Sequence, residues 1–62
     1  MRVLDLYMVL DDNNYIEIID EDRNVIMCGK PYDIPVSVLY SEVKSIKLAE
    51  NTNITDIEIR KR

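Results

Sequence analysis

The fold is decided by the stretch YIEIIDEDRNVIMC, which occupies residues 15–28. Near its start Ile16 and Ile18 alternate with Glu17, and this period of two is typical of a strand with one buried face. The stretch ends in a second apolar run at residues 25–28. Because a short polar segment separates the two runs, the stretch predicts a β-hairpin with strands at residues 15–19 and 25–28.

The polar segment, residues 20–24, predicts the turn of this hairpin. A loop of this length commonly holds one residue in the left-handed region, a position that glycine fills most easily. The segment contains no glycine, so the candidates for that position are Arg23 and Asn24. If Arg23 holds it, the turn stores strain, and Arg23→Gly should raise the melting temperature.

The second half of the chain predicts a short helix and a second hairpin. Pro35 fits the first position of a helix that runs to about Tyr40. Strands are expected at residues 43–48 and 54–60, joined by a turn at residues 51–53. A single amphipathic helix over residues 35–48 is the competing interpretation, because several apolar residues there lie at helical spacing. The β-branched residues of that range favour the helix followed by a strand.

The first apolar segment, residues 3–10, fits both a helix and a strand. We expect a short helix, because Leu and Met favour helices and Asp5 lies where a negative charge suits the first turn. The polar residues 11–14 end it. The sequence therefore predicts one α+β domain over residues 1–62, in the order helix, β-hairpin, short helix, β-hairpin, with a four-stranded antiparallel sheet covered on one face.

The composition argues against covalent and metal chemistry. The chain has 62 residues, no histidine and one cysteine, so it lacks a histidine base, a histidine metal ligand and an internal disulfide. A domain of this size rarely offers the water-excluding pocket that a catalytic carboxylate needs. We therefore expect no enzyme activity, no cofactor and no metal site. Cys28 is expected to be a small buried hydrophobe.

The charge of the chain is uneven. Its net charge is −4, from 8 basic and 12 acidic residues. Residues 1–33 hold eight acids and three bases, whereas residues 34–62 hold four acids and five bases. Asp20, Asp22 and Asn24 match the first three ligand positions of a calcium loop, but Val25 and Pro31 replace its required Gly and Glu. The acidic turns are therefore better explained as solvated turns, and as a negatively charged surface for a partner.

Short motifs spread over nearly the whole chain carry a resemblance: Val3-Leu4-Asp5-Leu6, Val9-Leu10-Asp11-Asp12, the hairpin of residues 16–26, Asp33-Ile34-Pro35, Leu39, residues 43–46 and Ile57-Glu58-Ile59. With these motifs the chain resembles small acidic proteins encoded by phages and mobile elements of Gram-positive bacteria. Those sequences often carry Gly in the hairpin where this one has Arg23. Very small acidic proteins in such elements include inhibitors of host defence nucleases, such as anti-CRISPR proteins.

From these observations we expect a non-catalytic protein-binding module, an inhibitor of a host defence or nucleic-acid enzyme that acts through an acidic surface. The expected partner is a host or phage protein, with a homodimer as a further possibility, no membrane contact and no direct contact with nucleic acid. A lone cysteine suits the reducing cytoplasm, where we expect the protein to reside. The expected partner-binding residues are Asp11, Asp12, Tyr15, Asp20, Glu21 and Asp22.

Two alternatives remain open. The first is a homo-oligomer that binds a small ligand or nucleotide. The second is a nucleic-acid-binding protein that uses the basic residues of the second half, namely Lys44, Lys47, Arg60, Lys61 and Arg62.

Overall fold

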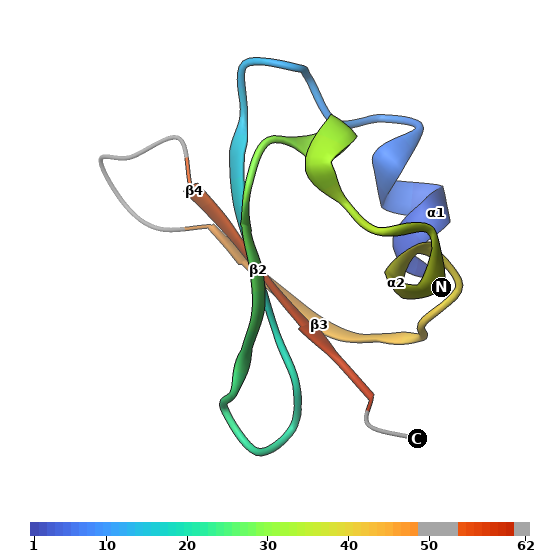
Figure 1. The fold of residues 1–62 in the computed structure, drawn as a ribbon, viewed down its shortest axis with the longest axis vertical. Coiled ribbons are helices and arrows are strands. Elements are labelled where there is room, and N and C mark those ends of the chain that lie inside the picture. The colour runs from blue at the N-terminus through green and yellow to red at the C-terminus, as the bar shows by residue number, and fades with distance from the viewer. Residues whose placement is uncertain (49–53, 61–62) are drawn as a thin grey trace.

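The computed structural model describes residues 1–48 and 54–60 and arranges them in two layers (Figure 1). One layer is a four-stranded sheet, made of β1 (Tyr15–Ile19), β2 (Val25–Gly29), β3 (Val43–Leu48) and β4 (Ile54–Ile59). The other layer holds the short helix α1 (Val3–Tyr7), the 3-10 turn η1 (Pro31–Asp33) and the short helix α2 (Val36–Leu39). The expected α+β class and the order of the elements are confirmed.

The sheet is mixed, and the expectation of a purely antiparallel sheet is wrong. Its strand order is β2-β1-β4-β3. The pairs β1–β2 and β3–β4 are antiparallel hairpins, but β1 and β4 run parallel, with Ile18 beside Ile57. The chain leaves β2 at one edge, crosses the sheet through η1 and α2, and enters β3 at the other edge. The strand β4 therefore returns in the direction of β1 and fills the centre, where its apolar face is buried most completely.

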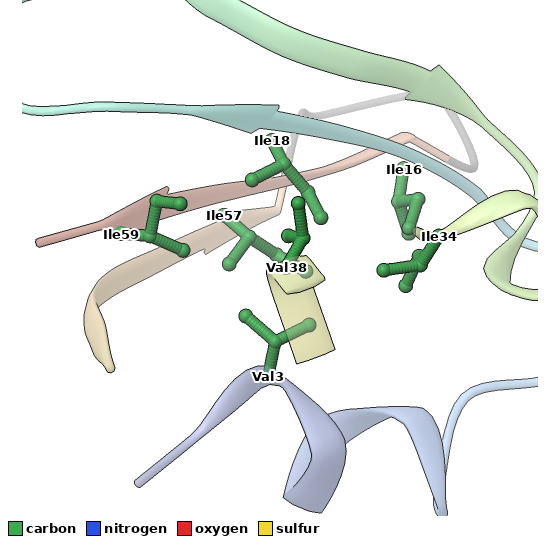
Figure 2. Packing of buried hydrophobic residues seen from close by; sticks show 7 residues of the cluster. All are labelled: Val3, Ile16, Ile18, Ile34, Val38, Ile57 and Ile59. Atoms are coloured by element: carbon green, nitrogen blue, oxygen red, sulfur yellow. The ribbon is translucent and has the colours of Figure 1, made fainter. Parts of the chain in front are cut away.

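The hydrophobic core lies between the sheet and the helices (Figure 2). The two central strands contribute one face of isoleucines, and α1, α2 and the chain between η1 and α2 cover that face. The buried apolar side chains are Val3, Ile16, Ile18, Ile34, Val38, Ile57 and Ile59. Val3, Ile16, Ile18 and Ile57 are completely inaccessible to solvent. Burial of these branched aliphatic side chains supplies the main driving force for folding.

The helical layer is made of very short elements. The backbone N–H of Arg2 donates to the Asp5 carboxylate at 2.9 Å, which satisfies one free donor at the start of α1. The prediction that Pro35 is the first residue of the helix is wrong. Pro35 has φ −61° and ψ 144°, an extended conformation, so it caps α2, and the helix begins at Val36. The strand β3 follows α2 closely, which excludes one continuous helix over residues 35–48. The expected turn at residues 51–53 lies outside the described residues.

The hairpin between β1 and β2 contains the expected left-handed residue. Arg23 has φ 68°, the positive value that glycine adopts more easily. The expectation for Cys28 is wrong, because this residue is exposed. Cys28 pairs with Glu17 across the hairpin, so it lies on the face of the sheet turned away from the helices, in a strand at the edge of the sheet.

Among the helices of residues 1–48 and 54–60, none has the length and apolar character needed to cross a membrane.

Candidate binding surface

The candidate binding surface is the face of the sheet turned away from the helical layer, which we call the open face. In β1 and β4 it carries the side chains that alternate with the buried isoleucines. Glu17 lies beside Asp56 in the parallel pair, and Ile19 lies beside Glu58. The three carboxylates belong to half-buried residues. The two-residue period that buries isoleucine on one face thus gathers carboxylates on the other.

A shallow groove of about 320 Å³ runs over this face. Three carboxylates line it, together with Lys47 and Ser45 from β3 and Arg23 from the hairpin turn. The register of β3 on β4 places Lys47 beside Asp56 and Ser45 beside Glu58. Small-molecule sites are predominantly apolar, whereas charged and polar side chains dominate this groove. The lining therefore suits a polar macromolecular surface better than a small ligand.

Lys44 connects the open face to the hairpin turn. Its ammonium nitrogen lies 3.3 Å from a carboxylate oxygen of Glu21 and 3.6 Å from one of Glu58. The register of β3 shifts between Val43 and Ser45, at the position of Lys44. The hydroxyl of Ser45 also donates to Glu58 at 3.3 Å. The acidic turn and the carboxylates of β4 therefore form one continuous charged region, partly neutralised by Lys44.

The structure separates the sequence-predicted binding residues into two groups. Asp11, Asp12 and Tyr15 lie at the start of β1, and the turn of residues 20–22 lies at its end (Figure 1). The Lys30 ammonium lies over the ring of Tyr15, 5.6 Å from its centroid, and Tyr15 remains 49% exposed. The turn of residues 20–22 adjoins the open face through the ion pairs of Lys44. Tyr15 alternates with the buried Ile16, so it also lies on the open face, at the other end of β1 from that turn, and Asp11 and Asp12 precede it in the chain.

In the turn of residues 20–22, Asp20 stabilises the backbone. Its carboxylate is buried and accepts hydrogen bonds from the backbone N–H groups of Asp22 at 2.8 Å and Asn24 at 3.0 Å. The side-chain amide of Asn24 also donates to this carboxylate, at 3.3 Å. Asp20 therefore holds the shape of the turn. Glu21 and Asp22 are exposed in the same hairpin turn, and the Glu21 carboxylate is paired with Lys44.

The first group is organised in a similar way. The Asp11 carboxylate accepts a hydrogen bond from the backbone N–H of Asn13 at 2.9 Å, and the Asn14 side chain accepts one from the N–H of Asp11 at 3.0 Å. Asp12 is exposed and is not used in these bonds. The Asp11 carboxylate therefore shapes the turn before β1, and Asp12 presents its charge outward.

Sequence reasoning missed three residues of the open face: Glu17, Asp56 and Glu58. Their signal was present, because each alternates with isoleucine in a predicted strand. Only the parallel pairing of β1 with β4 brings them together. On the same face, Lys44 and Lys47 lie among carboxylates, which interrupts the basic surface that nucleic-acid binding would need. Lys61 and Arg62 lie outside the described residues.

In the part of the chain that the structure describes, no three His, Cys, Asp or Glu side chains converge in a group that could hold a metal ion. Comparisons with protein-family models, with curated proteins and with solved structures found no significant match to this chain.

Proposed function

We propose that this chain is a non-catalytic protein-binding module that uses its open face and the adjoining hairpin turn to bind a basic surface on a partner protein. The observation that carries the proposal is the alignment of Glu17, Asp56 and Glu58 along the central parallel pair. These carboxylates lie in a groove on a firm two-strand support. Charges held on rigid strands lose little conformational entropy when a partner binds.

The partner class follows from the charge and from the sequence resemblance. A basic surface complements the groove and the exposed Glu21 and Asp22, and such complementarity speeds encounter and disfavours wrong partners. Enzymes that act on nucleic acid carry basic grooves. We therefore propose a host defence or nucleic-acid enzyme as the partner, with the open face occupying part of its basic surface.

Two double variants of equal net charge test the proposal. In the first protein, Asp56→Asn and Glu58→Gln remove two charges from the groove while keeping the size of the side chains. In the second, Asp12→Asn and Glu42→Gln remove two charges from exposed positions that do not line the groove. The net charge is equal in the two proteins, so any difference between them reports the position of the charges.

The three proteins, wild type included, are immobilised and exposed to a lysate of a Gram-positive bacterium, and the bound proteins are identified by mass spectrometry. We expect a basic protein that binds wild type and the Asp12/Glu42 variant but is depleted on the Asp56/Glu58 variant. With that protein purified, the Asp56/Glu58 variant should associate about three- to tenfold more slowly at low salt and depend less on salt. Equal association rates for the two variants would contradict the proposal.

A further inference from the structure

The sheet has two edge strands, and they differ in the charge of their exposed side chains. The order β2-β1-β4-β3 leaves β2 and β3 at the edges. The outer side of an edge strand presents backbone N–H and C=O groups that can pair with a further strand. Within the described residues, β2 packs extensively against β1 alone and β3 against β4 alone. The side chains of the two strands decide which edge accepts a partner.

The edge at β3 carries the features that oppose pairing. Lys44 and Lys47 are exposed, and Lys44 is held by its ion pairs with Glu21 and Glu58. The register of β3 is irregular between Val43 and Ser45, but that of β2 is irregular at Ile26, so this feature does not distinguish the two edges. Lysines at an edge are a device that keeps a second strand away. The edge at β3 is therefore poorly suited to pair with a further strand.

The edge at β2 lacks charge along its whole length, from Val25 to Gly29. Val25 is 60% exposed and Ile26 is 40% exposed, and Cys28 is exposed as well. The strand has one irregularity at Ile26, because Ile19 pairs with Val25 and Ile18 with Met27. Residues 27–29 pair regularly with β1. An uncharged, regular segment centred on Cys28 therefore lies at the free edge.

The charges that flank β2 favour a particular partner and direction. Residues 20–23, before the strand, contribute three carboxylates and one guanidinium, and Lys30 follows the strand directly. The nearby Asp33 carboxylate accepts the backbone N–H of Lys30 at 3.2 Å, while the Lys30 ammonium extends over Tyr15. An antiparallel second copy of β2 would bring the acidic turn of each chain toward Lys30 of the other. A parallel copy would bring the two acidic turns together, which is unfavourable.

We infer that β2 is the surface through which two copies of this chain pair, antiparallel and about a two-fold axis. The same strand contributes from both copies, as in other two-fold interfaces. Antiparallel pairing requires the axis to stand perpendicular to the sheet, so both helical layers lie on one side and both open faces on the other. Cys28 then lies opposite Cys28 of the second copy. The acidic hairpin turn takes part in both proposals, but the groove carboxylates Glu17, Asp56 and Glu58 play no part in this pairing. Variants of those carboxylates and variants of the β2 edge therefore test the two proposals separately.

Sedimentation equilibrium over a range of protein concentrations tests this interface with a matched pair of variants. Ile26→Lys places a charge on the β2 edge, and Ile46→Lys places the same charge on the β3 edge, at residues with exposed fractions of 40% and 43%. We expect wild type and Ile46→Lys to form dimers and Ile26→Lys to raise the dissociation constant about tenfold or more. Val25→Lys, at a residue 60% exposed, should also raise the dissociation constant of the dimer. Circular dichroism confirms that each variant is folded.

A second measurement uses the wild-type chain alone. Residues directly opposite in an antiparallel pair have Cα atoms about 4.5–5.5 Å apart, a separation that permits a disulfide. Added diamide, which accepts the two electrons and two protons of the two thiols, should therefore link Cys28 of the two copies. Wild-type chain that stays monomeric at concentrations of about 1 mM would overturn the inference. So would a dimer that Ile46→Lys dissociates at least as much as Ile26→Lys, or a dimer that diamide does not link.

Discussion

Arg23 offers the sharpest test of how this sequence fits its fold. It is held at φ 68° in the hairpin turn. A non-glycine residue in this region loses about 1–2 kcal/mol relative to the right-handed region. Glycine removes that strain but adds about 0.4–1 kcal/mol of conformational entropy to the unfolded chain. We therefore expect Arg23→Gly to stabilise the fold by about 0.5–1 kcal/mol, which raises the melting temperature of a domain of this size by about 2–8 °C.

The assay is thermal unfolding followed by circular dichroism, with Arg23→Ala as the control. The alanine variant loses the same guanidinium from the rim of the groove but keeps a Cβ atom, so the backbone strain stays. Arg23→Gly should therefore melt above both wild type and Arg23→Ala. A glycine variant that melts no higher than the alanine variant would refute this prediction, because relief of strain would then contribute nothing to stability.

Two further predictions concern the turn and the core, and both are measured by urea unfolding. Asp20→Ala should lower the free energy of unfolding by about 2 kcal/mol, because two backbone N–H groups of the turn lose their acceptor; a loss no greater than that of Asp12→Ala would contradict this role. Ile57→Ala should cost about 2–5 kcal/mol, because the side chain is completely buried. The control Ile46→Ala, at a residue 43% exposed, should cost less than about 1 kcal/mol, and similar losses for the two variants would place Ile57 outside the core.

The elements that sequence reasoning located well are those with a local signal. The strand over residues 15–19 agrees with β1 because Ile16 and Ile18 alternate with Glu17 and are fully buried. The strand over residues 43–48 agrees with β3. The sequence limits the left-handed residue to Arg23 or Asn24, because turn geometry depends on a few neighbouring residues. Local periodicity and turn chemistry were sufficient for these features.

The features that sequence reasoning missed depend on contacts between distant segments. The period of two in β4 is the same for a parallel and an antiparallel neighbour, so it does not indicate that Ile57 lies beside Ile18. Without that pairing, Glu17 and Glu58 have no reason to be considered together. Likewise, the exposure of Cys28 follows from the place of β2 at the edge, which the sequence of β2 does not determine.

The parallel pairing of β1 and β4 also bears on how the chain reaches this structure. Each hairpin supplies only one of the two central strands, so neither can complete the core alone. Partners such as Ile16 and Thr55 are far apart in sequence, and closing so long a loop slows folding. The two hairpins should therefore acquire their order in a single cooperative step. Cutting the chain between them should leave two fragments that stay unstructured apart and recover the sheet when mixed.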